Sequence, residues 1–223
     1  RVDREAGKLT SGQDATMLNT PDWLWQSWCQ AYGEDAAHQI AAAHLKAPEL
    51  DLTVIADAAS WAQKLDGRLL PTGSIRLPVS TRVQELTGYE NGAWWVQDTA
   101  ASLPAQLFGK DLAGQKIADI CAAPGGKTAQ LLAAGAEVIA LDSSDKRLQT
   151  LKENLNRLSL TAETICVDAV SWRPEELLDG VLLDAPCSAT GTIRRHPDVA
   201  YLKRPEDVSH AGQAQFQLLN AAT

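Results

Sequence analysis

The segment from Lys116 to Lys127, KIADICAAPGGK, constrains the fold of this chain more than any other. A short apolar run leads into a turn rich in proline and small residues, which is typical of a buried parallel strand and the loop after it. The segment 180–191, GVLLDAPCSATG, repeats the pattern, and two further apolar runs end at Asp142 and Asp168. Ligands of open α/β sheets bind at the carboxyl ends of the strands. The four segments therefore predict one shared crevice with a polar group at each strand end.

The turn at 121–127 suits a nucleoside ligand. Gly125 and Gly126 let backbone N–H groups approach a ligand closely, and the helix expected at 128–134 directs its positive end to the same place. A nucleotide-binding P-loop would need glycine at the position of Cys121, and the adjacent glycines do not fit the GxGxxG spacing. Asp142 follows the loop at about the 20 residues that ribose recognition requires. S-adenosylmethionine is a ligand of this kind.

The composition bounds the class of protein. The chain has 223 residues, of which 45% are hydrophobic, and this suffices for one substantial core or two smaller ones. Its apolar runs are far shorter than the roughly 20 residues that cross a bilayer, and segment 1–14 lacks the apolar part of a signal peptide. We therefore expect a cytoplasmic protein without a membrane partner. Four cysteines without CxxC spacing favour reduced thiols and argue against a metal site.

The first part of the chain predicts a linker and a small domain. Residues 1–19 are polar and indicate a linker or the end of a preceding domain, and a start at Arg1 rather than Met suggests a fragment. Residues 20–90 predict a small α+β domain. Its first helix begins with Thr20 as N-cap and Pro21 at the first helical position, and it ends at Gly33. The other predicted elements are a helix at 35–46, a strand at 50–55, a helix at 56–65 and a strand at 74–79.

The later part predicts strands and helices in alternation. A short strand at 94–97 precedes an amphipathic helix at 100–108, for which Asp98 and Thr99 are capping candidates. The strands that end before Cys121 and at Asp142, Asp168 and Asp184 follow, and residues 208–222 predict a last helix. The formal net charge of −8 counts against a nucleic-acid partner. Residues 193–204, IRRHPDVAYLKR, nevertheless concentrate positive charge, and this cluster fits either an RNA contact or a solvated surface.

These motifs together carry a family resemblance. CAAPGGK at 121–127, then Asp142, Asp168, DAPCSATG at 184–191 and IRRHPD just after it resemble the Sun (Fmu) family of S-adenosylmethionine-dependent RNA cytosine-5 methyltransferases. The resemblance covers most of the chain and is weaker over 34–76. It implies a doubly wound, Rossmann-like α/β methyltransferase domain over residues 91–223, incomplete at its carboxyl end, after a small RNA-binding domain. The substrate it implies is RNA, with 16S ribosomal RNA in first place.

The resemblance also implies roles for single residues. Asp142 would bind the ribose hydroxyls of S-adenosylmethionine, Asp168 would lie by the adenine, and Asp184 would face the reacting methyl group and the base. A methyltransferase sheet of this family would have seven strands in the spatial order 3-2-1-4-5-7-6, and this chain would supply strands 1 to 4. The remaining cofactor contacts would come from Cys121, Ala122, Ala123, Pro124, Gly125, Gly126 and Lys127. The RNA contacts would come from Arg194, Arg195 and His196.

The chemistry of cytosine methylation requires cysteine. C5 of cytosine is too poor a nucleophile to accept a methyl group unaided, so a thiolate adds to C6 first and a base later removes the C5 proton. In the family, one cysteine of the DAPC turn assists product release, and the nucleophile lies in a later TCS-type motif. Cys187 matches the first, and the second is expected beyond Thr223. The chain alone would then be inactive, and the complete enzyme a monomer.

Two other functions fit the same residues. One is a noncatalytic RNA-binding protein that retains the cofactor pocket. In the other, Cys187 is itself the nucleophile, as in the PC motif of DNA cytosine methyltransferases.

Overall fold

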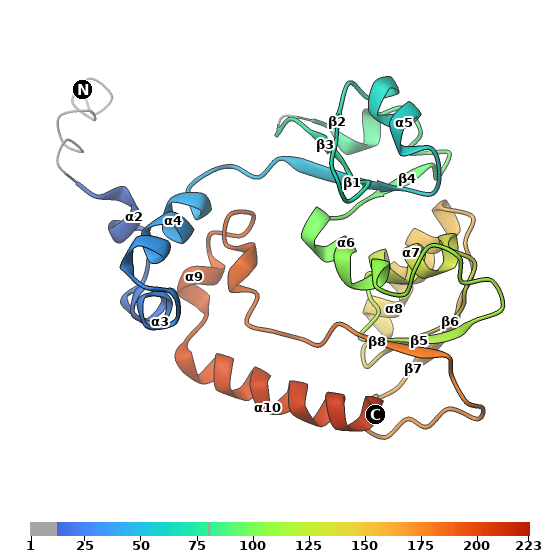
Figure 1. The fold of residues 1–223 in the computed structure, drawn as a ribbon. Coiled ribbons are helices and arrows are strands. Elements are labelled where there is room, and N and C mark those ends of the chain that lie inside the picture. The colour runs from blue at the N-terminus through green and yellow to red at the C-terminus, as the bar shows by residue number, and fades with distance from the viewer. Residues whose placement is uncertain (1–12, 80) are drawn as a thin grey trace. The chain divides into compact units, whose positions relative to one another are not determined.

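The computed structural model describes residues 13–79 and 81–223 (Figure 1). Contacts divide the chain into two compact units. We call Arg1–Pro48 with Cys187–Ala211 the helical unit, and Glu49–Pro186 with Gly212–Thr223 the sheet unit. Boundaries of contact clusters differ from boundaries of independently folding domains, so domains at 1–19, 20–90 and 91–223 stay a prediction. Among the described residues, no helix combines the length and the apolar composition needed to cross a membrane.

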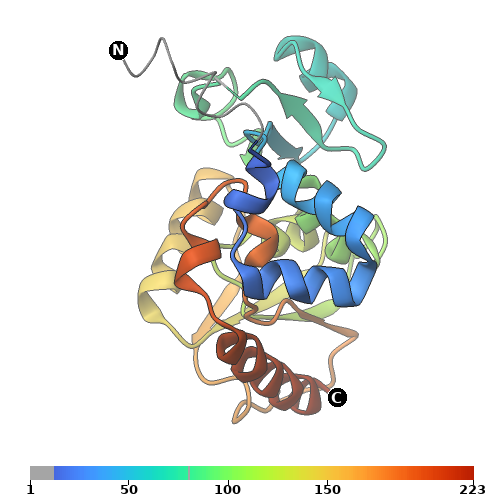
Figure 2. The same cartoon turned by 90° about the vertical axis from the view of Figure 1, so that its left-hand side faces the viewer.

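The helical unit is built from short helices around a small core. Leu24, Ile193 and Ala200 are buried in it, and Trp23 and Trp28 pack against them. Figure 2 shows the two longest helices of its amino-terminal part side by side in blue. The elements are α2 (Ala15–Leu18), α3 (Asp22–Tyr32), α4 (Glu34–His44), the 3-10 turn η2 (Thr190–Thr192), α9 (Val199–Leu202) and the first turns of α10 (Pro205–Ala222).

The start of α3 differs from the prediction by one residue. Pro21 is the N-cap and Asp22 the first helical residue, so the expected cap at Thr20 is wrong. The hydroxyl of Thr20 donates instead to the carbonyl oxygen of Thr16, at 2.7 Å, and is therefore engaged by the preceding turn of chain. The predicted end of the helix is confirmed, because Gly33 adopts a φ of 83° directly after α3.

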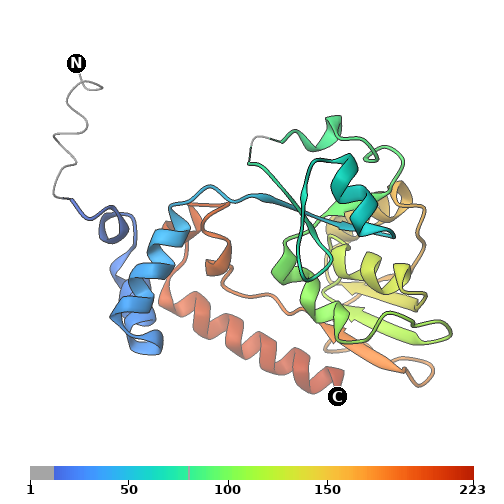
Figure 3. The same cartoon turned by 45° about the horizontal axis from the view of Figure 1, so that its top comes forward.

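An antiparallel sheet forms the first part of the sheet unit. Its strand order is β2-β3-β1-β4, and α5 lies against it (Figure 3). Leu52, Ile75 and Trp94 are fully buried between the sheet and this helix. The predicted strands and helix are confirmed with shorter bounds, and β2 was not predicted. The elements are β1 (Leu50–Val54), α5 (Ala58–Lys64), β2 (Arg68–Leu69), β3 (Ile75–Leu77), η1 (Val83–Glu85) and β4 (Trp94–Val96).

A parallel sheet forms the second part, with strand order β7-β6-β5-β8. This is the predicted order of the first four strands, and β8 lies at an edge of the sheet within the described residues. Ala129 and Leu151 pack on one face, and Leu218 and Ala222 of α10 pack on the other (Figure 1). The elements are α6 (Thr99–Gln106), β5 (Lys116–Ile120), α7 (Gly126–Ala133), β6 (Glu137–Asp142), α8 (Asp145–Arg157), β7 (Glu163–Cys166) and β8 (Gly180–Leu183).

Within the sheet unit, two sets of contacts join the antiparallel sheet and the turn before β4 to helices α6 and α8. Asp51 is 2% exposed and accepts hydrogen bonds from Arg76 at 2.6 and 2.8 Å and from the backbone N–H of Thr99 at 3.1 Å. Arg157, the last residue of α8, donates to the carbonyl oxygens of Tyr89 and Trp94. The first contact fixes the start of α6 and the second fixes the end of α8. The part of the chain that forms the antiparallel sheet therefore holds one end of α6 and one end of α8.

Candidate active site

The parallel sheet brings the predicted strand ends to one edge. Asp142 is the last residue of β6, and Asp184 directly follows β8. Asp168 lies two residues beyond β7. The turn at 121–127 follows β5, which lies between β6 and β8. Since all four strands are parallel, their carboxyl ends meet as the sequence predicted.

The turn after β5 requires glycine at position 125, whereas Gly126 lies at ordinary contact distance from a neighbouring side chain. Gly125 has a φ of 102°, and a Cβ there would lie 3.0 Å from Cγ of Leu151. A Cβ on Gly126 would lie 3.4 Å from Nε2 of Gln97. Gly126 is also the first residue of α7. The turn thus presents bare backbone at a helix amino terminus, the arrangement that binds polar ligand groups.

Asp142 is a buried carboxylate with one oxygen left over. Its side chain is almost completely buried, and Oδ1 accepts a hydrogen bond from the backbone N–H of Ser144 at 3.0 Å. Oδ2 lies 3.3 Å from a guanidinium nitrogen of Arg147, yet no described residue donates a hydrogen bond to it. The same Arg147 donates to the carbonyl oxygen of Ala123 at 2.6 Å. Arg147 therefore ties the turn after β5 to the end of β6.

Asp119 lies behind the same turn. It is 1% exposed, and Oδ2 accepts a hydrogen bond of 2.6 Å from the hydroxyl of Thr128 in α7. Burial raises the pKa of Asp119 to about 7, although the bond from Thr128 and the charge of Lys127 act in the opposite direction. Its Oδ1 has no hydrogen-bond partner among the described residues. A carboxyl group near its pKa at neutral pH thus lies beneath the first turn of α7.

Lys127 and Asp184 form an ion pair across the site. Nζ of Lys127 lies 2.6 Å from Oδ2 of Asp184. The side chain of Asp184 is 56% exposed, whereas that of Lys127 is 13% exposed. The Lys127 side chain, which is largely covered, therefore orients an accessible carboxylate.

The two predicted cysteines differ in exposure. Burial raises the pKa of the Cys121 thiol to about 11, and the charge of Asp142 adds to the effect. Cys121 thus stays a thiol at neutral pH and is no nucleophile. Cys187 is exposed, and its Sγ accepts a hydrogen bond from the N–H of Ala189 at 3.4 Å. Cys187 belongs to the helical unit and Asp184 to the sheet unit.

The remaining predicted residues have local partners. Asp168 is exposed, and its Oδ1 accepts from the backbone N–H of Val170 at 3.0 Å, which is a turn-capping contact. Arg195 and His196 follow η2, and their backbone N–H groups donate to the carbonyl oxygen of Thr192. Their side chains are exposed, and that of Arg194 is half-buried.

Sequence reasoning missed Thr128 and Arg147 at this site. Thr128 follows Lys127 directly. Its side chain is fully buried and donates a hydrogen bond to Asp119. Arg147 lies five residues after Asp142 in the first turn of α8. Its role depends on a contact to residue 123 that no local pattern predicts.

No cluster of His, Cys, Asp or Glu in residues 13–79 and 81–223 could hold a metal ion. The absence of a metal cofactor stays a prediction.

Comparisons with known proteins show which family this chain is similar to. Residues 110–223, about half of the chain, match the family described as 16S rRNA methyltransferase RsmB/F. Ribosomal RNA small subunit methyltransferase B of Vibrio vulnificus is 47% identical over 154 residues, which are 66% of this chain and 36% of the relative. Its namesake in Vibrio cholerae is 36% identical over 227 residues, 95% of this chain and 52% of the relative. The chain thus spans about half the length of such relatives, or less.

A solved structure extends the likeness to the fold. The structure of NSun6 from Pyrococcus horikoshii with SFG superposes with a TM-score of 0.79 at 17% identity and covers 91% of this chain and 79% of its own. The predicted doubly wound, Rossmann-like methyltransferase fold is thereby confirmed, and so is the family resemblance. Because the family model matches about half of its length, this chain belongs to the 16S rRNA methyltransferase RsmB/F family.

Proposed function

We propose that this chain carries the cofactor site and part of the catalytic site of an enzyme that methylates C5 of a cytosine in RNA, with S-adenosylmethionine as methyl donor and 16S ribosomal RNA as substrate. One observation carries the proposal. Asp142, at the carboxyl end of β6, has a buried oxygen that no described residue hydrogen-bonds, next to a glycine-rich turn that opens α7. A ribose supplies the two hydroxyl donors that such a carboxylate accepts.

The residues fit the parts of S-adenosylmethionine. Backbone groups of 121–127 receive its methionine part, and Asp142 its ribose. Asp168 lies on the adenine side, in keeping with its exposure just after β7. When bound, the sulfonium supplies an electrophilic methyl group. The carboxylates of Asp142 and Asp168 also favour a ligand that carries positive charge.

Asp184 acts on the cytosine. Its exposed carboxyl group, positioned by Lys127, meets the N3 edge of the base and, in its protonated form, donates a hydrogen bond to N3 as the thiolate adds to C6. A thiolate from a TCS-type motif is the nucleophile, and Cys187 assists release of the methylated base. The exposed thiol of Cys187 is consistent with a role that requires contact with RNA. Cys121 takes no covalent part because it stays protonated.

The side chains of Arg194, Arg195 and His196 contact RNA phosphates. The small domain at 20–90 contributes to RNA binding, and the enzyme acts as a monomer in the cytoplasm, without a metal. RNA as partner agrees with the names of the relatives, which specify ribosomal RNA.

Binding of S-adenosylmethionine tests the proposal directly. Calorimetry with Asp142→Ala should show binding weaker by about 1 to 3 kcal/mol, since charge-assisted hydrogen bonds to the ribose are lost. Asp145→Ala is the matched control, because Asp145 is an exposed carboxylate in the first turn of α8. Equal affinities of both variants and wild type would contradict the cofactor site. Analysis of digested RNA for 5-methylcytidine then tests the reaction itself in the enzyme with both cysteine motifs.

A further inference from the structure

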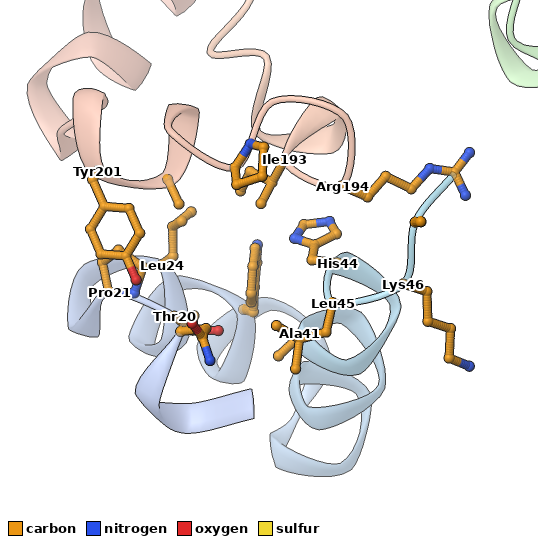
Figure 4. A pocket seen from close by; sticks show the side chains of 15 residues that line it. Thr20, Pro21, Leu24, Ala41, His44, Leu45, Lys46, Ile193, Arg194 and Tyr201 are labelled. Atoms are coloured by element: carbon orange, nitrogen blue, oxygen red, sulfur yellow. The ribbon is translucent and has the colours of Figure 1, made fainter. Parts of the chain in front are cut away.

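A pocket of about 330 Å³ lies within the helical unit (Figure 4). It is bordered by α3, α4 and the segment that runs from Ile193 to Tyr201. All of its lining residues belong to the helical unit, whereas Asp119, Asp142 and Asp184 belong to the sheet unit. The pocket is therefore a separate feature from the candidate active site.

The walls of the pocket are apolar and aromatic. Leu24 and Ile193, both buried, line it together with the rings of Trp28, His44 and Tyr201. The rings of Trp28 and His44 meet edge to face, with centroids 5.3 Å apart. Tyr201 is 64% exposed and so has ring surface open to a ligand. Such walls suit a flat, partly apolar group.

His44 gives the pocket a polar group without a partner. Its Nδ1 is buried, and no described residue makes a hydrogen bond to it. Burial, and to a smaller degree the charge of Arg194, lower the pKa of His44. The ring is therefore neutral at pH 7, with one nitrogen as donor and the other as acceptor. A ligand that has hydrogen-bonding groups on the edge of a ring can satisfy Nδ1.

The charge of the lining has one sign. Lys46 and Arg194 line the pocket, and no Asp or Glu does. This contrasts with the whole chain, which has 28 acidic and 20 basic residues. In Figure 4 the side chains of Arg194 and Lys46 lie on the same side of the pocket, beyond His44 and Leu45, and their charged ends point outward. The site thus combines aromatic walls with a cationic side, which suits a ligand that joins a flat ring to an anion.

We propose that this pocket binds one unpaired nucleotide of the RNA, with its base among Trp28, His44 and Tyr201 and its phosphate near Lys46 and Arg194. The inference rests on RNA as the substrate proposed above, and it adds a second nucleotide site to the one for the reacting cytosine. Proteins recognise unpaired RNA by splaying out single bases, stacking them on aromatic side chains and bonding their edges. The pocket offers aromatic rings for stacking and Nδ1 of His44 for the edge of the base, and the two cations supply phosphate contacts.

The test separates base recognition from phosphate attraction. A single-stranded heptauridylate and an abasic heptamer with the same number of phosphates are titrated with the full chain by fluorescence anisotropy. Wild type should bind the RNA with bases about tenfold more tightly, the scale of one stacked base. Ala47 is an exposed residue of the pocket lining. Ala47→Trp places a large ring there and should abolish this preference. Ala43→Trp, an exposed site on α4 outside the lining, is the matched control and should keep it.

A second pair of variants tests the cationic side. Lys46→Glu should weaken binding of the RNA with bases severalfold more than Lys152→Glu, which changes the net charge equally on an exposed site of α8. Equal effects of the two would overturn the proposal, as would a wild type that binds both heptamers alike. If uridine monophosphate displaced the heptamer when present at the same concentration, the pocket would be assigned to a free nucleotide. This result would also overturn the proposal. S-adenosylmethionine binding, measured in parallel, distinguishes these failures from that of the cofactor site.

Discussion

The side-chain amides of Gln97 and Gln130 are joined by a hydrogen bond of 2.7 Å from Nε2 of the first to Oε1 of the second. Gln97 is 7% exposed, and its own Oε1 accepts from the indole N–H of Trp95 at 3.0 Å. Gln130 in turn donates to the carbonyl oxygen of Ser102 at 3.0 Å. The pair links β4, α6 and α7 directly behind Gly126. The glycine-rich turn therefore rests on a buried polar network.

Replacing Gln97 by Leu should destabilise the fold and weaken cofactor binding. The indole of Trp95 and the amide of Gln130 would lose buried partners, and each loss costs about 1 to 3 kcal/mol. We expect a fall of about 2 kcal/mol or more in the free energy of unfolding, measured with urea, and a higher Kd for S-adenosylmethionine. Gln63→Leu, on an exposed face of α5, is the control and should change neither. Wild-type stability of Gln97→Leu would contradict the role of the network.

The turn before β4 should tolerate no side chain at Gly92. Its φ is 64°, and a Cβ there would lie 2.1 Å from the carbonyl oxygen of Arg157 at the end of α8. Gly73 has a φ of 85° but nothing within 4 Å of its Cβ position. Gly73→Ala should therefore cost only the roughly 1 to 2 kcal/mol of the left-handed backbone, and Gly92→Ala clearly more. Equal losses of stability in urea would show that the contact with Arg157 relaxes freely.

Asp119 should make stability depend on pH. Because its pKa is raised from 3.8 to about 7, the folded state binds more protons than the unfolded state between these values, and stability falls as pH rises through this window. Between about pH 5 and pH 8 the loss amounts to roughly 2 to 3 kcal/mol. Asp119→Asn removes the ionisation, so unfolding in urea at the two pH values should show a smaller fall. A wild type and variant with parallel pH profiles would contradict the raised pKa.

Much of the parallel sheet could be predicted because its signals are local. Each strand is an apolar run, and the polar residue or glycine that ends it stands next to it in the sequence. The order β7-β6-β5-β8 followed from the family resemblance and is confirmed. The helix limits at Gly33 and Asp98 also follow from local chemistry, since a glycine with positive φ ends one helix and a carboxylate caps the other.

The contacts at the site between residues far apart in the sequence could not be predicted. Gln97 and Gln130 are 33 residues apart, and Arg157 reaches the carbonyl of Tyr89 across 68 residues. Nothing in the local sequence marks either partner, because a Gln or Arg at these positions is equally typical of a solvated surface. The cap of α3 failed for a related reason, since the hydroxyl of Thr20 has a competing acceptor in Thr16.

The RNA contacts of the basic cluster can be measured by their dependence on salt. Arg194→Ala with Arg195→Ala should lower RNA affinity and reduce the slope of log K against log salt by roughly one to two units, since each lost phosphate contact releases fewer counterions. Lys152→Ala with Lys146→Ala, two exposed cations of α8, is the control. An unaltered slope in the first double variant would assign the cluster to a solvated surface.

The two roles open to Cys187 predict opposite results. Its exposed thiol is the reactive candidate among the predicted cysteines, because Cys121 is held protonated by burial. If Cys187 assists release, Cys187→Ala in the enzyme with both cysteine motifs should accumulate a covalent protein–RNA complex through the other cysteine, seen as a slow band on a denaturing gel. If Cys187 is the nucleophile, the same substitution should abolish the complex. Cys166→Ala, which removes another exposed thiol, is the control and should leave the band as in wild type. We expect accumulation, because the DAPC turn matches the release cysteine of the family, and loss of the band would make Cys187 the nucleophile.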